Sequence, residues 1–396
     1  MADSGNANDF SKGSIARNIM DLAVPMTLAQ LINVMYSIVD RIYIGHLPQA
    51  SAQALTGIGL CLPIITIITA FANFFGMGGA PLCSIARGGH EEKRAEKVMG
   101  NSFTMLLISG AVLMAVCLLF KEPLLYLFGA SEATYPYADQ YITVYICGTL
   151  FVMTSLGMNN FINAQGFGKT GMLTVLLGAV MNIILDPVFN YGFNMGVKGA
   201  AWATIISQTV SALWVFLFLC SKKSILRLQL PNLRLDRNML KPVLALGLSP
   251  FIMQATECLV QLTFNTGMQR YGNDYYVGAM TILFSVSQML FLPMQGLAQG
   301  ATPIISYNFG AGNPERVKKA FRLMAIASLA FSFCATGIIL LFPRPFISMF
   351  SNDPEIIRIG SYGIRIYTIG FLFFGIQCAC QQTFIALGQA KISMFL

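Results

Sequence analysis

The chain has 396 residues, of which 55% are hydrophobic and 11% are charged, whereas soluble domains carry about 25% charged residues. With a mean hydropathy of +0.64, this composition excludes a soluble globular enzyme, a disordered protein and a disulfide scaffold. The net charge of +8 predicts basic loops beside anionic lipid and no nucleic-acid partner.

Charged breaks divide the chain into ten long apolar segments, and a helix needs about 20 such residues to cross a membrane. The segments cover residues 19–45, 54–80, 98–120, 137–165, 172–190, 199–220, 243–268, 276–305, 320–342 and 356–388. An eleventh apolar run begins near Ile392. Residues 1–18 are polar, and the first apolar run contains Pro25 and Arg41, so we predict a cytoplasmic amino-terminal segment and no cleavable signal. The pattern predicts an all-α integral membrane protein embedded in the lipid bilayer.

Lysine and arginine are distributed unevenly between the breaks. With Arg322 and Arg358, which lie near the ends of their segments, counted in the adjoining breaks, the amino-terminal segment and the even-numbered breaks hold 18 of them and the odd-numbered breaks hold 5; Arg41 and Arg365 fall within predicted helices. Because basic loops are retained in the cytoplasm, this distribution predicts a cytoplasmic amino terminus. The most basic break, residues 221–242, is predicted to be a cytoplasmic linker.

A shift of 222 residues reveals an internal repeat. It carries Pro123 onto Pro345, Tyr145 onto Tyr367, Gly148 onto Gly370, Gly166 onto Gly388 and Lys169 onto Lys391. The repeat predicts two parallel six-helix lobes, an N-lobe over 19–220 and a C-lobe over 243–396. A complete second copy would extend to about residue 444 by the same repeat, so we expect a carboxyl-terminally truncated C-lobe with helices seven to ten and the start of an eleventh.

Three carboxylates lie deep in apolar runs, where an ionised group is costly unless it is functional: Asp40, Asp186 and Glu257. In the predicted topology Asp40, Tyr141, Asp186 and Thr204 lie at nearly one depth, and Asn182 is one turn below Asp186. Such oxygens can bind a hard cation such as Na⁺, and the two aspartates can instead share a proton. The structural alternatives are a helix-end turn at Asp186 before Pro187, and an ion pair of Asp40 with a lysine or arginine.

Glu257 has two open interpretations, a proton or substrate site and a structural hydrogen bond to a neighbouring helix. The 22 Met and 30 Phe residues are compatible with a soft pocket for apolar cations. Gly296 and Gly300 indicate close helix packing. No nucleotide motif or catalytic constellation is found, since Asn163 stands where a phosphate loop needs its first glycine; we therefore predict no enzyme activity and no cofactor beyond a coupling ion, H⁺ or Na⁺.

Several motifs resemble the MATE (multidrug and toxic compound extrusion) family, and its MepA-type bacterial branch in particular. They are Ser37-Ile-Val-Asp40-Arg-Ile-Tyr-Ile-Gly45, Met181-Asn-Ile-Ile-Leu-Asp186-Pro187, Gly199-Ala-Ala-Trp-Ala-Thr204 and Gly310-Ala-Gly-Asn313. The resemblance implies two V-shaped lobes in a bacterial plasma membrane that export organic cations by antiport. It places the cation site at Asp40, Asn182, Asp186 and Thr204, with Tyr141 nearby, and a glutamate on helix seven is similar to the NorM-like branch. We expect a monomer.

Two other functions remain as alternatives. A lipid or lipid-linked glycan flippase can share a two-lobe body, but it should have a cationic central cavity for pyrophosphate. An aspartyl intramembrane protease also pairs two aspartates, but it needs a GxGD-type motif, and Asp186 lies in Leu-Asp-Pro instead.

Overall fold

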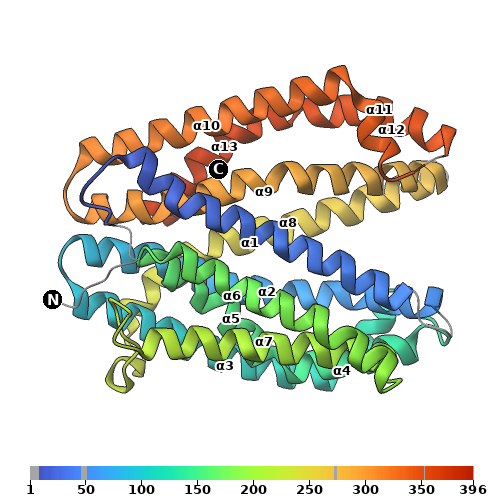
Figure 1. Cartoon of the computed structure of the whole chain (residues 1–396), viewed down its shortest axis with the longest axis horizontal. Coiled ribbons are helices and arrows are strands. Elements are labelled where there is room, and N and C mark those ends of the chain that lie inside the picture. Colours follow the sequence, from blue (N-terminus) through green and yellow to red (C-terminus); the bar gives the residue numbers. More distant parts are fainter. Residues whose placement is uncertain (1–8, 46–50, 272–273, 352, 396) are drawn as a thin grey trace.

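The computed structural model describes residues 9–45, 51–271, 274–351 and 353–395, although some side chains near 37–55 and 258–281 are outside the description. Throughout these ranges the regular structure is helical and contains no strand. The prediction of an all-α protein is therefore confirmed. Figure 1 shows two groups of helices, with α1 running obliquely between them.

The helices follow the order of the predicted segments. The first half contains α1 (Ile15–Gly45), α2 (Ser51–Gly88), α3 (Glu92–Leu127), α4 (Tyr135–Cys147), α5 (Thr149–Ala164), α6 (Gly168–Pro187), the π-helix η1 (Val188–Gly192) and α7 (Val197–Cys220). The second half contains the 3₁₀ helix η2 (Leu230–Leu233), α8 (Arg237–Tyr271), α9 (Asp274–Gly310), α10 (Pro314–Leu341), α11 (Pro343–Ser348), α12 (Pro354–Ile369), α13 (Phe371–Ala386) and α14 (Ala390–Phe395). Among the described residues, seven helices are long and apolar enough to cross a membrane, or up to nine if each bent pair counts as one span.

The predicted segments 137–165 and 356–388 are each bent rather than straight. The α4–α5 pair bends by 58° and the α12–α13 pair by 40°, at Gly148 and Gly370. A Cβ at Gly148 would overlap the side chain of Ile205 on α7, so glycine permits the close approach at the first bend. Apolar residues continue through both bends, and hydropathy alone therefore does not reveal them.

The internal repeat is visible in the hydrogen bonds. Ser84 Oγ of α2 donates to the Ala164 carbonyl of α5 at 3.1 Å. Ser306 Oγ of α9 donates to the Ala386 carbonyl of α13 at 2.8 Å. The 222-residue shift carries the first pair onto the second, so the two halves share a fold and not only a pattern of helices.

The two halves meet through glycines on the side of the molecule where the amino terminus lies. A Cβ at Gly88 of α2 would overlap the Tyr307 carbonyl oxygen of α9, and a Cβ at Gly310 would overlap the Ile85 carbonyl oxygen. These two contacts are again related by the 222-residue shift. The predicted packing role of the Gly296/Gly300 pair is confirmed, since a Cβ at Gly300 would lie 2.6 Å from the Ala23 backbone nitrogen of α1.

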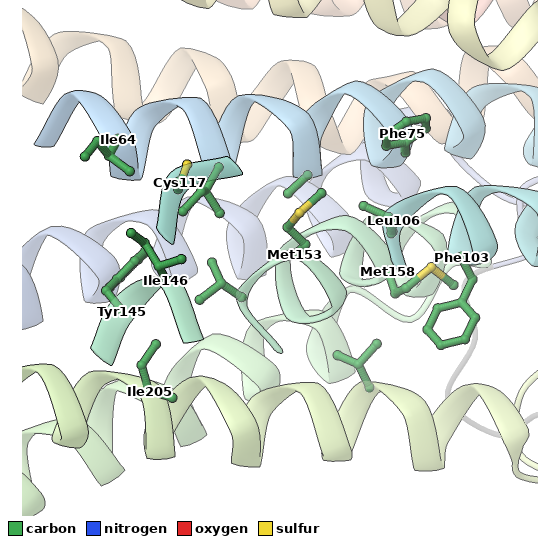
Figure 2. Packing of buried hydrophobic residues seen from close by; sticks show 14 of the residues in the cluster. Ile64, Phe75, Phe103, Leu106, Cys117, Tyr145, Ile146, Met153, Met158 and Ile205 are labelled. Atoms are coloured by element: carbon green, nitrogen blue, oxygen red, sulfur yellow. The ribbon is translucent and has the colours of Figure 1, made fainter. Parts of the chain in front are cut away.

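The core of the first half is a layer of interlocking apolar side chains. Phe75, Leu106, Met153 and Met158 are all at most 2% exposed, and Figure 2 shows side chains of α2, α3, α4, α5 and α7 meeting there. Because lipid is as apolar as these residues, shape-complementary packing stabilises the layer more than transfer out of water does.

The linker predicted over 221–242 folds back onto the first half. The Gln165 side-chain oxygen accepts hydrogen bonds from Ser224 Oγ at 2.9 Å and from the Leu226 backbone nitrogen at 2.8 Å. Thr104 Oγ1 of α3 donates to the Leu233 carbonyl at 2.8 Å. The linker therefore covers the end of the helices rather than extending away from them, and α8 begins before the predicted residue 243.

The segment before α1 is anchored to both halves. Phe10 is 1% exposed, packs edge-on against Tyr307 at 5.7 Å, and lies under the Arg87 guanidinium at 5.4 Å. Arg316 of α10 donates to the carbonyls of Phe10 at 3.0 Å and Lys12 at 3.2 Å. One short segment thus connects α2, α9 and α10.

We expect Arg316→Ala to release this segment. Hydrogen bonds from a charged donor contribute about 1.5–3 kcal/mol, so detachment should become about tenfold or more frequent. Limited trypsin digestion after Lys12 should accelerate accordingly. Lys318→Ala is the matched control, because Lys318 pairs only with the exposed Glu315 and should leave the digestion rate unchanged; equal rates in both variants would contradict the anchoring.

Candidate functional site

The centre of the candidate site is the junction between α6 and η1. Pro187 lacks a backbone N–H, which interrupts the α-helical hydrogen-bond ladder, and the chain continues as a π-helix from Val188. Asp186 lies at this junction and is 0% exposed. Asp186 is therefore in the last turn of α6, and the chain winds on directly as η1. Single π-helical turns of this kind are frequent at functional sites.

The structure brings Asn182 and Thr204 together. Asn182 Nδ2 of α6 donates to Thr204 Oγ1 of α7 at 3.4 Å, and the threonine hydroxyl donates to the Ala200 carbonyl at 3.0 Å. Asn182 is 2% exposed, and its side-chain oxygen has no hydrogen-bond partner among the described residues. This oxygen is available to a cation, and it lies one helical turn before Asp186 on α6.

A small polar cavity opens beside this pair. Its volume is about 40 Å³, and it is lined from α1, α5, α6 and α7. The polar lining residues are Asn33, Tyr36, Ser155, Asn182, Thr204, Ser207, Gln208 and Ser211. A single water needs roughly 10–15 Å³ measured in this way, so the cavity can hold a small ion or a few waters. Amide and hydroxyl oxygens are the ligands that hard cations prefer.

The other two residues of the predicted cluster are placed less completely. Tyr141 of α4 is 5% exposed and stacks on Tyr145 with ring centroids 6.2 Å apart, in a helix that packs against α7. Asp40 lies near the end of α1, but its side chain, like that of Arg41, is outside the described residues. Their membership of the cluster stays a prediction.

Asn190 is a candidate that the sequence analysis missed. It lies in η1, is 3% exposed, and neither of its side-chain polar atoms has a partner among the described residues. The signal was present, because Asn182, Asp186 and Asn190 recur every four residues and so occupy one face of a helix. The π-helical turn after Pro187 concealed this regular spacing, since the number of residues per turn changes there.

Glu257 lies apart from this cluster, in a cavity of the second half. The cavity has a volume of about 460 Å³ and is lined from α8, α9, α12, α13 and α14. Its wall combines the Glu257 carboxyl with glutamines and aromatic rings: Gln288, Gln295, Gln377, Gln381, Phe284, Phe291, Tyr367 and Phe374. No lysine or arginine is among the lining residues. Such a wall suits a cation better than an anion.

The described residues contain no group of three or more His, Cys, Asp or Glu side chains that could hold a metal.

The chain is similar to several known proteins. The model of the MatE family matches residues 25–188 and 250–396. The chain is 27% identical to the Multidrug export protein MepA of Staphylococcus haemolyticus over 97% of its own length and 86% of the relative's. It is also 27% identical to the protein of the same name from Staphylococcus saprophyticus, over 94% and 83%.

Solved structures show the same fold. A crystal structure of a MATE protein in the bent conformation has a TM-score of 0.90 at 23% identity, with 97% of this chain and 84% of that chain covered. A MOP superfamily transporter from Pyrococcus furiosus also has a TM-score of 0.90, at 22% identity, with 98% and 86% covered. The predicted carboxyl-terminal truncation is not supported by these alignments, which include nearly all of this chain.

Proposed function

The chain belongs to the MatE family, whose members are membrane transporters and not enzymes, and we propose that it exports organic cations by antiport with Na⁺ or H⁺. In this proposal the N-lobe (19–220) binds the coupling ion and the C-lobe (243–396) contributes to the substrate cavity. The protein acts as a monomer in a bacterial plasma membrane, with its amino terminus in the cytoplasm.

The buried cluster on α6 and α7 is the observation that carries the proposal. A fully buried aspartate is costly in a membrane protein unless a protein partner, an ion or a proton compensates it. Asn182 and Thr204 place neutral oxygens on a cavity of about 40 Å³, and Asp186 is buried one helical turn farther along α6. Since no nucleotide motif is found in the sequence, we propose that an inward ion gradient acting through this site drives export.

The cavity at Glu257 supports a cationic substrate. Aromatic faces and one carboxyl attract organic cations, and a lipid pyrophosphate would need basic residues in the same place. The relatives that are called multidrug export proteins support drug-like small molecules as the exported class. The flippase alternative is therefore disfavoured by the lining of this cavity.

The contacts between the halves support alternating access. The described interhalf contacts at Gly88, Gly300 and Gly310 all lie on the side of the amino terminus. In the proposed orientation, these contacts close the path to the cytoplasm. Substrate loading then requires these backbone contacts to separate.

Thr204→Val should weaken coupling-ion binding without unfolding the protein. The change keeps the side-chain shape but removes the hydroxyl that accepts from Asn182, and loss of such a supporting bond lowers ion affinity about 10- to 100-fold. The ion concentration for half-maximal efflux should rise by that factor. Thr209→Val on the same helix is the control, because its hydroxyl bonds only to the Ile205 carbonyl; the proposal fails if both variants respond alike.

Dye accumulation in cells tests the function itself. Cells that express the chain should retain less of a fluorescent organic cation than cells without it. Collapse of the ion gradients should abolish the difference, while ATP depletion with imposed gradients should not. Equal retention with and without the protein would contradict the proposed export.

A further inference from the structure

A second polar cavity lies at the end of the C-lobe farthest from the amino-terminal segment (Figure 1). It has a volume of about 780 Å³ and lies between the end of α10, the short α11 and α12. Three arginines line it: Arg344, Arg358 and Arg365. It is distinct from the cavity at Glu257, with which it shares no lining residue.

The charges around this cavity are only partly compensated. Arg358 pairs with Glu355, with its Nε 3.0 Å from the carboxylate, and Asp353 is engaged as the cap of α12. Arg344 and Arg365 have no ion pair within the described part of the chain. Three arginines are therefore opposed by only two carboxylates, those of Asp353 and Glu355, and both carboxylates already accept hydrogen bonds. The cavity wall keeps a net positive charge.

The wall also contains an unsatisfied hydroxyl. Ser361 Oγ is buried and has no hydrogen-bond partner among the described residues, although Ser361 lines the cavity. Arg358, Ser361, Tyr362 and Arg365 follow the three- and four-residue spacing that places side chains on one face of a helix. The helix thus presents donors in a row toward the cavity.

This concentration of arginine is unexpected for this side of the membrane. The odd-numbered breaks hold only 5 lysines and arginines, against 18 in the amino-terminal segment and the even-numbered breaks. Arg344 and Arg358 are two of those 5, and Arg365, from within a predicted helix, lies on the same helix α12 as Arg358. Orientation alone disfavours basic residues here, so their clustering needs a local reason.

We propose that this cavity binds a phosphate group, supplied by the headgroup of an anionic lipid. Guanidinium groups bind phosphate oxygens through paired, charge-assisted hydrogen bonds, and basic pockets between membrane helices bind lipid headgroups. Leu341 and Phe342 at the rim are 73% and 60% exposed. These apolar side chains lie where acyl chains below a bound headgroup would pass.

Thermal unfolding in detergent tests the site with three probes. Short-chain phosphatidylglycerol carries the phosphate and acyl chains, inorganic phosphate carries only the anion, and a short-chain diacylglycerol carries only the chains. We expect phosphatidylglycerol to raise the Tm most and diacylglycerol to leave it unchanged. An equal shift with inorganic phosphate would support the same site with a free anion as ligand.

The Arg344→Gln/Arg365→Gln variant should bind phosphatidylglycerol at least about tenfold more weakly. Arg322→Gln is the matched control, an exposed arginine at the other end of α10 that should retain full binding. Arg344→Lys/Arg365→Lys keeps the charge and provides a second measurement if the glutamine variant unfolds; it should bind with intermediate affinity. The proposal would be overturned if diacylglycerol raised the Tm as phosphatidylglycerol does. It would also be overturned if phosphatidylglycerol raised the Tm of the glutamine or lysine variant as much as that of the parent.

Discussion

Asp186→Asn should reduce coupled efflux to background while the protein remains folded. The substitution preserves size but removes the negative charge that would balance a bound cation or carry a proton. Because Asp186 is 0% exposed and burial of an ionised group is costly, the neutral variant should be at least as resistant to thermal unfolding as the parent.

Asp139→Asn is the matched control for this experiment. Asp139 is on α4 of the same lobe and pairs with Lys121 at 2.7 Å, with both side chains about 30% exposed. Partly exposed pairs contribute at most about 1 kcal/mol, so efflux should be nearly unchanged. If the Asp186→Asn protein exported drug at the rate of the Asp139→Asn protein, Asp186 would not belong to the coupling site.

Gly310→Val should abolish efflux for a different reason. The new side chain would overlap the Ile85 carbonyl oxygen of α2, and backbone atoms cannot rotate away as a flexible side chain can. The two lobes would therefore be held apart on the side of the amino terminus. A transporter that cannot reach one of its two states completes no cycle.

The state of the variant can be measured independently of transport. Met26 is 5% exposed between α1 and the C-lobe helices, so a cysteine introduced there should be labelled faster in the Gly310→Val protein than in the parent. Gly337→Val is the control, because nothing lies within 4 Å of a Cβ at that position. Unchanged labelling together with normal efflux would contradict the role of the Gly310 contact.

Much of the fold was predictable because it depends on composition over long windows. The apolar segments, the charge bias and the 222-residue repeat are properties of many residues at once, and the helices begin and end near the predicted limits. The bends at Gly148 and Gly370 were not predictable. They depend on how closely one helix approaches another, as at Ile205, and hydropathy contains no information about that distance.

Part of the candidate site was predictable from local motifs and spacing. Asn182, Asp186 and Thr204 follow from motif and helical spacing, and the structure places Asn182 against Thr204. Asn190 was missed because a π-helical turn changes the period after Pro187. The cavity of arginines was missed because Arg344 comes from a six-residue helix, and only the packed structure places it beside α12.

Transport in proteoliposomes tests cation-coupled export most directly. Vesicles that contain the purified chain and a fluorescent organic cation are given either a Na⁺ gradient or a pH gradient alone, without nucleotide. We expect the dye to move against its own gradient under at least one of the two conditions, and not to move in the Asp186→Asn protein. Dye movement that is independent of both gradients, or equal in the Asp186→Asn protein, would contradict cation-coupled export.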